Sequence, residues 1–446
     1  MALRYVDCTV TINDEESLVI EYEEAGKSKE FDGQLAPDPF ARMTVERMHE
    51  WVSFGLKMQQ DLRLSQDAFK ADDLKLIGLN LHRILFGHEK VKPIIEKVIQ
   101  QFETRYEEEK QRSDPPNLRL RLRLVFKPGA DRLGKLPWEF LYVPGEENPL
   151  ETGYFFAGSR RELILTRYVP PVKGAVPEPV EKLKILLAVY TPAGLGEISE
   201  TDLGLVETQM KAIPAQVERA ENLPYDELKQ KIKAVQPHIF HYVGHGEQGR
   251  LSMVKKETDP DYDEKAPDPQ VRWITGAQFK NLFSDDPKPR LVFLHACKSS
   301  AAGSEDAFRG CARELVERVP AVVAMQYSIS NIDAGTFAKN FYERLGAGCE
   351  IDEAVRVGRY VLGEMYPSWE HPRFGTPVVY LRNNEPLVMP LGAATGEARG
   401  ATAEPSAGLT TGIAGTRAVG AAASGTPTTP ATSVPAETGE AGGLKG

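Results

Sequence analysis

Two stretches of this sequence place reactive side chains where they could carry out acyl-transfer chemistry together. An apolar run, HIFHYV, is followed by Gly-His-Gly, so that His245 lies between Gly244 and Gly246. A second apolar run, RLVFLHA, ends at Cys297, 52 residues after His245. A cysteine thiolate can attack a carbonyl carbon, and a nearby imidazole can protonate the leaving group. We therefore expect His245 and Cys297 to form a catalytic dyad, with the backbone N–H groups of Gly246 and Cys297 stabilising the oxyanion.

Each of these residues also has a more ordinary interpretation. A cysteine at the end of a strand is usually a small buried hydrophobic residue, and a single histidine is usually just satisfied by hydrogen bonds. His241 and His245 share the HxxxH spacing of some metal sites, but metal ligation at that spacing needs a helix, whereas the pattern around Gly244 indicates a strand. We therefore expect no metal and no cofactor. Three neighbouring histidines are expected to be structural: His238, His241 and His295.

Bulk composition narrows the range of functions. The 446 residues are 41% hydrophobic and 26% charged, which is typical of a globular protein, and the formal net charge is −10. This charge argues against a nucleic-acid-binding protein, because such proteins need a basic face. The alternating stretch LRLRLRL at 118–124 predicts a half-buried strand instead of a nucleic-acid-binding segment. The sequence contains neither a GxxxxGK[ST] phosphate loop nor a GxSxG motif.

The sequence also indicates a location in the cell. No apolar run approaches the ~18 residues that a membrane span requires, and the first residues lack the apolar centre of a signal peptide. We therefore expect no association with a membrane. The cysteines show no CxxC spacing, which argues against a disulfide framework and a zinc site and favours a reducing cytoplasm. They are Cys8, Cys297, Cys311 and Cys349.

The second half of the chain alternates between strand and helix patterns. Apolar strands are expected at 184–190, 216–219, 238–244, 290–296, 321–327 and 376–382. Helices are expected at 200–213, 225–235, 275–283, 305–319, 334–345 and 351–365. Nearly continuous apolar strands separated by helices indicate a largely parallel sheet that is covered on both faces. Ligands bind beyond the carboxyl ends of such strands, so His245 and Cys297 would meet at one edge if their strands are neighbours.

The first half has a different pattern. The runs LRYVDCTVTI and ESLVIEYEEA predict a β-hairpin, and a second hairpin is predicted around YFFAGS and ELILTRYV. Between them we expect helices at about 41–60 and 72–110, a strand at 118–126, and a packing role for Trp138. The predicted units are an N-terminal α+β region at 1–170, an α/β core at 180–385 and a disordered tail at 391–446. The tail is rich in Gly, Ala, Thr, Ser and Pro and could bury too little apolar surface to fold.

The GHG and HAC motifs resemble the two signature blocks of the caspase-like peptidases, and caspases place the histidine about 50 residues before the cysteine. Among these, the sequence is similar to the CHAT domain, which implies a caspase–haemoglobinase fold. Further similar segments follow in the family's order between Gly78 and Arg382: LGLNLHRILFG, LPWEFLYVP, FRGCARELVERVPAVVAMQYSIS, FAKNFYERLGAGCEIDEAVRVGRYVL and PVVYLR. The resemblance implies that 180–385 is a caspase-like peptidase core and that the CHAT unit begins at about residue 78. It also implies that His245 and Cys297 are the dyad, with Gly246 at the oxyanion site.

Two departures limit what the resemblance implies. The sequence has HACKS where caspases have QACRG, so specificity for aspartate is not implied, and it has no TPR repeats of the kind often joined to CHAT domains. In this fold the segment MQYSISNID at 325–333 tends to contribute to the substrate pocket. The sequence does not assign a side chain to that pocket.

The resulting hypothesis is a cysteine endopeptidase that cleaves a partner protein, in bacterial defence or stress signalling. Constant activity would harm the cell, so we expect low activity until an activating partner protein or processing releases it. The charged loop at 255–272 is a better candidate for this control than the tail, because it is tied at both ends near the site. The alternative is a non-catalytic CHAT-type interaction module.

Overall fold

The computed structural model describes residues 3–24, 26–61, 71–112, 116–158, 160, 162–169, 180, 182–195, 198–247, 249–296, 305–327, 329, 331–364 and 372–382. All of these residues belong to one compact unit. Cys297, residues 170–179 at the predicted boundary between the first two units, and the tail at 391–446 lie outside the described residues, so the predicted division of the chain into domains stays a prediction. No helix within the described ranges is long and apolar enough to cross a membrane.

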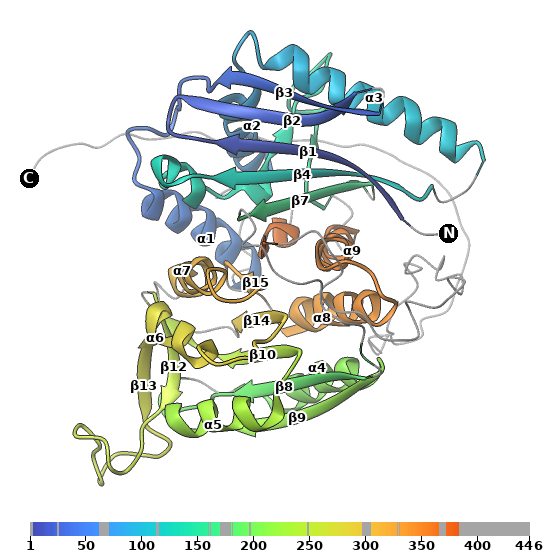
Figure 1. Ribbon diagram of the computed structural model, residues 1–446. Coiled ribbons are helices and arrows are strands. Elements are labelled where there is room, and N and C mark those ends of the chain that lie inside the picture. Colours follow the sequence, from blue (N-terminus) through green and yellow to red (C-terminus); the bar gives the residue numbers. More distant parts are fainter. Residues whose placement is uncertain are drawn as a thin grey trace, which may run out of the picture. The chain divides into compact units, whose positions relative to one another are not determined.

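Eleven strands of the described residues form one sheet, and most neighbouring strands run parallel (Figure 1). The order is β3 (Lys27–Gln34), β2 (Ser17–Glu24), β1 (Arg4–Ile12), β4 (Leu118–Phe126), β7 (Leu163–Tyr168), β16 (Pro377–Leu381), β15 (Ala321–Met325), β14 (Leu291–Ala296), β10 (Ile239–Gly244), β8 (Leu183–Val189) and β9 (Ala215–Glu221). Within this described sheet, only β1–β2, β2–β3 and β15–β16 pair antiparallel. The predicted α/β class with a mainly parallel sheet is confirmed, as is the first hairpin.

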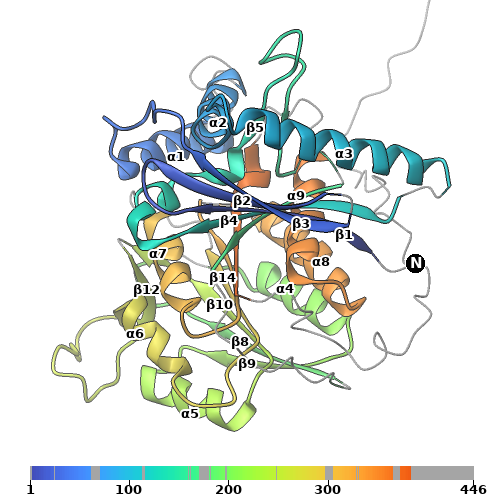
Figure 2. The ribbon, with the colours of Figure 1, turned by 45° about the horizontal axis from the view of Figure 1, so that its top comes forward.

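Helices cover both faces of the sheet (Figures 1 and 2). One face packs against α4 (Glu200–Lys211), α8 (Asn331–Gly346) and α9 (Ile351–Glu364). The other is covered by α1 (Val45–Asp61), α2 (Ala71–Phe86), α3 (Lys92–Lys110), α5 (Tyr225–Val235), α6 (Gly276–Lys280) and α7 (Glu305–Leu315). This arrangement explains why the central strands are apolar on both sides.

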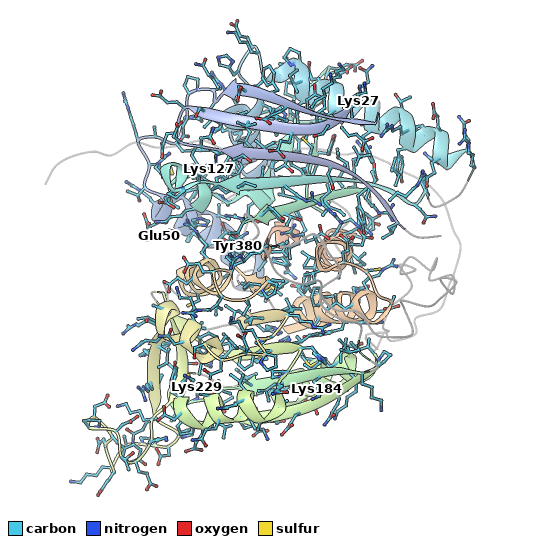
Figure 3. All side chains as sticks on the ribbon, viewed as in Figure 1. Lys27, Glu50, Lys127, Lys184, Lys229 and Tyr380 are labelled. Atoms are coloured by element: carbon cyan, nitrogen blue, oxygen red, sulfur yellow. The ribbon has the colours of Figure 1, made fainter. Side chains whose placement is uncertain are left out.

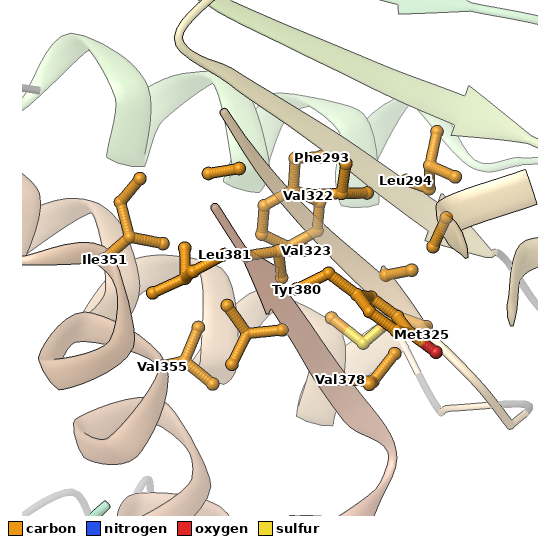
Figure 4. Close-up of a cluster of buried hydrophobic side chains, with 14 of the residues drawn as sticks. Phe293, Leu294, Val322, Val323, Met325, Ile351, Val355, Val378, Tyr380 and Leu381 are labelled. Atoms are coloured by element: carbon orange, nitrogen blue, oxygen red, sulfur yellow. The ribbon is translucent and has the colours of Figure 1, made fainter. Parts of the chain in front are cut away.

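A cluster of buried apolar side chains lies along the paired strands β14, β15 and β16 and includes residues of α9. Phe293, Val323 and Val378 of the strands and Val355 of the helix are fully buried there (Figure 4). Burial of each large apolar side chain stabilises the fold by about 1.5–3 kcal/mol. Charged side chains such as Lys184 instead project from the outside of the ribbon (Figure 3). The strands that carry the candidate site are therefore held by an apolar interior.

The prediction of a half-buried strand at 118–124 was wrong, because β4 is buried on both faces. Its leucines pack in the apolar core, while Arg119 and Arg121 face the beginning of α9. The Nε atom of Arg121 lies 2.7 Å from Oδ2 of Asp352, and Nε of Arg119 lies 3.7 Å from Oε1 of Glu353. The acidic first turn of α9 thus covers the arginine face. Alternating polar residues indicate exposure only when no distant partner of opposite charge covers them.

The second predicted hairpin was also wrong. β7 pairs in parallel with β4 and with β16, whereas β6 (Tyr154–Phe155) pairs with β5 (Tyr142–Val143). The apolar run in β7 is buried on both faces, which suits an interior strand better than a hairpin arm. Two features were not predicted. One is β3, a mostly exposed and charged edge strand. The other is a small sheet of β11 (Gly246–Glu247), β12 (Arg250–Val254) and β13 (Val271–Thr275).

Candidate active site

The candidate site lies at the carboxyl end of β10 and β14. These strands are parallel neighbours, and their paired positions run from Ile239 with Leu291 to Gly244 with Ala296. His245 is the residue after Gly244, and Cys297 is the residue after Ala296. The expectation that the two strands are neighbours and end at the same edge is confirmed. Cys297 itself lies outside the described residues, so the dyad stays a prediction.

The backbone of His245 is held on both sides by Ser252 of β12. The His245 N–H donates to Oγ of Ser252 at 3.0 Å, and the Ser252 N–H donates to the carbonyl oxygen of His245 at 2.9 Å. The Tyr242 hydroxyl lies 3.2 Å from the His245 carbonyl oxygen and 2.8 Å from that of Ser252. The small sheet that was not predicted therefore fixes the position of the candidate catalytic histidine.

Gly244 is required by the position of the Tyr242 ring. A Cβ atom at residue 244 would lie 2.3 Å from the Tyr242 hydroxyl oxygen, which is too close for any side chain. The ring of Tyr242 is itself fixed by Tyr190, which stacks on it at a centroid distance of 5.6 Å, and by Phe279, which meets it edge-on. The glycine before the histidine therefore makes room for the tyrosine that contacts the histidine backbone.

Gly246 begins β11 and is paired with Leu251 in the antiparallel small sheet. This pairing continues the chain away from His245 as a short strand, which brings β12 against the carboxyl end of β10. The predicted contribution of the Gly246 N–H to an oxyanion site stays a prediction.

Two other histidines, His241 on β10 and His238 just before it, make structural contacts. Nδ1 of His241 lies 2.7 Å from the hydroxyl oxygen of Tyr342, and its ring stacks on Phe293 at 4.4 Å. Burial, followed by the nearby His295, holds the pKa of His241 well below its ordinary value. His238 accepts a hydrogen bond at Nδ1 from the Lys184 N–H at 3.0 Å. Both residues are therefore better suited to packing as neutral imidazoles than to binding protons.

The segment predicted to contribute to the substrate pocket begins at a buried anchor. Gln326, directly after β15, donates from Nε2 to Oε2 of Glu139 at 2.9 Å and to the Gly375 carbonyl at 2.7 Å. Glu139 also accepts two hydrogen bonds from Arg167, at 2.9 and 2.6 Å. Burial alone would raise the pKa of Glu139, but the charge and hydrogen bonds of Arg167 lower it below its ordinary value.

Glu139 follows Trp138 in the LPWEF motif. The side chain of Trp138 is fully buried, and its Nε1–H donates to the Leu133 carbonyl at 2.7 Å, so its predicted packing role is confirmed. Sequence reasoning missed the neighbouring glutamate. A charged residue between two buried aromatic residues was the available signal for a buried ion pair.

Two further contacts involve described residues of the segment at 325–333, which was predicted to contribute to the substrate pocket. The Tyr327 hydroxyl lies 2.7 Å from Nδ1 of His49 in α1. Asp333, in the first turn of α8, is buried and forms an ion pair with Arg373. The first contact connects the end of β15 to α1, and the second connects the beginning of α8 to the turn at 372–375 before β16.

The loop at 255–272 leaves the end of the β12–β13 hairpin farthest from Gly246 (Figure 1). Its Pro269 carbonyl accepts a hydrogen bond from the Ala193 N–H at 2.7 Å, in the segment that follows β8. Nζ of Lys256 lies 3.5 Å from a carboxylate oxygen of Asp226 in α5. The loop therefore contacts the carboxyl edge of the sheet beside the candidate site.

A family model described as the CHAT domain matches residues 83–366, which is more than half of the chain. The chain belongs to the CHAT domain family. The resemblance to the CHAT domain is thereby confirmed over residues 83–366, and the α/β fold with a mainly parallel sheet that it implied is confirmed by the strand order.

Solved structures similar to this CHAT protein include a Saccharomyces cerevisiae separase–securin complex. The match has a TM-score of 0.42 and 13% identity, and it covers 84% of this chain and 30% of the other. A secreted C11 cysteine protease from Bacteroides thetaiotaomicron, in complex with an irreversible peptide inhibitor, matches with a TM-score of 0.27 and 10% identity. That match covers 42% of this chain and 59% of the protease chain. No curated protein matches the CHAT protein in sequence.

Proposed function

We propose that this CHAT protein is a cysteine endopeptidase with Cys297 as nucleophile and His245 as general acid and base. The observation that carries the proposal is the pairing of Gly244 with Ala296. Each is followed by one member of the dyad, and neighbouring strands lie about 4.8 Å apart. The two side chains therefore start from adjacent positions at the edge where parallel sheets bind ligands.

The chemistry would proceed in two steps. The Cys297 thiolate attacks the peptide carbonyl carbon, and the oxyanion that forms accepts hydrogen bonds from the N–H groups of Gly246 and Cys297. The C–N bond then breaks as the protonated His245 gives its proton to the leaving amine, which leaves a thioester. In the second step His245 takes a proton from a water molecule as the water oxygen attacks the thioester carbonyl carbon; the C–S bond then breaks, the acid product leaves, and the Cys297 thiolate and protonated His245 are restored.

The burial of His245 supports the expected control of this activity. Only 1% of the residue is exposed, and a peptide can approach the imidazole only if neighbouring groups move. We therefore propose that basal activity is low and that an activating partner protein or processing opens the site. The setting in bacterial defence or stress signalling stays a prediction.

The same burial also favours a second candidate, a CHAT-type interaction module without catalytic activity. A buried histidine whose backbone is fixed by Ser252 and Tyr242 could serve packing alone. The two candidates differ in whether any peptide bond is broken.

The test is incubation of the full chain with a peptide library and identification of the products by mass spectrometry. The peptidase proposal expects a reproducible set of cleavage sites with a shared residue preference, which mild proteolytic nicking of the protein should enhance. A library left intact by both the native and the nicked protein would favour the interaction module.

A further inference from the structure

A polar pocket lies on the hairpin that holds His245. Its volume is about 500 Å³, within the range of about 300–1,000 Å³ that is common for ligand sites. The side chains that matter for its chemistry come from β12, β13 and the loop between them: Arg250, Lys255, Asp259, Asp261, Arg272 and Trp273. This pocket was not predicted from the sequence.

The pocket and the candidate active site share the strand β12. Arg250 is paired with Glu247, two residues after His245. Ser252, which holds the His245 backbone, is paired across the hairpin with Trp273. A chain segment bound in the pocket would therefore lie within a few residues' length of the histidine.

Two ion pairs within the pocket already place carboxylates against its cations. Nζ of Lys255 lies 3.0 Å from a carboxylate oxygen of Asp261, and Nη1 of Arg272 lies 3.5 Å from one of Asp259. A hydrogen bond from Lys255 is the largest influence that lowers the pKa of Asp261. Two cations of the pocket are thus occupied by carboxylates of the chain's own loop. The side chain of Asp261 is 75% exposed, so an incoming group has access to this pair.

Arg250 is the third cation and has a different environment. Its guanidinium lies over the Trp273 ring, 5.7 Å from the centroid, and it forms no ion pair with a carboxylate among the described residues. An arginine held against an aromatic face keeps its planar donors available for a carboxylate. Arg250 therefore offers the pocket an additional carboxylate site.

We propose that this pocket binds an acidic segment of the protein substrate, with Arg250 as the main contact and with Asp259 and Asp261 as internal competitors. The proposal rests on the peptidase function proposed above and adds a substrate class to it. Charge complementarity of this kind selects partners and speeds their association more than it strengthens a final complex. The pocket would place acidic substrates beside His245 while the chain as a whole, at −10, repels them.

The experiment measures binding without turnover, by fluorescence anisotropy with the full-length Cys297→Ala protein. The probes are a fluorescein-labelled peptide rich in aspartate and an isosteric peptide with asparagine at each of those positions. We expect the aspartate peptide to bind at least about tenfold more tightly, and Arg250→Gln to remove that difference, because hydrogen bonds between charged groups contribute this much. The matched control is Arg105→Gln, an exposed arginine on α3 that should leave binding unchanged.

A second variant keeps the proposal testable if Arg250→Gln does not fold. Removing the internal competitors with Asp259→Asn and Asp261→Asn should tighten binding of the aspartate peptide several-fold. Equal affinity for both peptides, or unchanged affinity in both the arginine and the aspartate variants, would overturn the proposal. Preferential binding of labelled single-stranded DNA that Arg250→Gln abolishes would overturn it as well, since the pocket would then recognise phosphate.

These results are distinguishable from a failure of the peptidase proposal. Cleavage of neutral peptides by the native protein, without selective binding of the aspartate peptide, would contradict the pocket proposal alone. Selective binding by a native protein that cleaves no peptide would contradict the peptidase function and leave the pocket as a site for an acidic partner segment.

Discussion

Gly244 and Ala296 are paired on neighbouring parallel strands, and each is followed directly by one residue of the proposed dyad. On the β10 side, the backbone of His245 donates a hydrogen bond to Oγ of Ser252 at 3.0 Å and accepts one from the Ser252 N–H at 2.9 Å. The sheet therefore sets the spacing of Gly244 and Ala296, and the small β-sheet after His245 sets the direction of the chain there.

Gly244→Ala should reduce both stability and turnover. The added methyl group would meet the Tyr242 hydroxyl at 2.3 Å, which forces the ring away from the His245 carbonyl and costs about 1–3 kcal/mol. Thermal unfolding and kcat/KM measure the two effects. Gly204→Ala in α4 is the matched control, because no atom lies within 4 Å of its added Cβ, and it should be neutral or slightly stabilising. Equal thermal stability and equal kcat/KM of the two variants would show that neither quantity depends on the present position of Tyr242.

Glu139→Gln should destabilise the protein by about 3–5 kcal/mol, because it leaves the buried Arg167 without its carboxylate. Urea unfolding at pH 7 measures this loss. Glu50→Gln, an exposed position on α1, is the control and should have little effect. A native-like unfolding midpoint for Glu139→Gln would contradict the importance of this ion pair.

The same residue predicts a dependence of stability on pH. The pKa of Glu139 is lower in the folded protein than its unfolded value of about 4.3. Its carboxylate therefore contributes stability above about pH 4.3, and that contribution is lost as the pH falls through the lower folded pKa. The difference in unfolding free energy between the native protein and Glu139→Gln should shrink steadily below pH 4.3. A difference in unfolding free energy that grows as the pH falls would contradict a lowered pKa of Glu139 in the folded protein.

Iodoacetamide should label Cys297 before the other cysteines. Burial raises the pKa of Cys8 to about 12 and also raises the pKa values of Cys311 and Cys349, so few of their thiols ionise at neutral pH. Peptide mapping after brief treatment at pH 7.5 measures the order of labelling. Modification of Cys8 or Cys311 ahead of Cys297 would argue against an activated thiolate at residue 297.

Chelation should leave peptide cleavage unchanged. His241 and His245 share HxxxH spacing but lie on and just after a strand, and the ring of His241 is engaged by Tyr342 and Phe293. Turnover with and without EDTA is the measurement. A complete loss that added zinc restores would bring back the metal-site interpretation of these histidines.

The sequence correctly predicted the features that depend on local residue patterns. Its predictions failed where contacts between residues far apart in the chain determine the structure. Apolar strands separated by helices predicted the parallel sheet, and two strands ending in His245 and Cys297 predicted a shared edge. The alternation in β4 was misleading because Asp352 and Glu353, more than 200 residues away, cover its arginines. The contacts of Ser252 and Tyr242 with His245 depend on a two-residue strand, β11, which is too short to give a periodic signal.

The most direct test of the central claim is the rate at which variants of the two dyad residues cleave the best peptide from the library. Cys297→Ala and His245→Ala should each lower kcat/KM by at least about a thousandfold without a large change in thermal unfolding. Cys349→Ala, which removes a cysteine outside the proposed site, should cleave at the native rate. Cleavage by Cys297→Ala at the native rate would contradict the account.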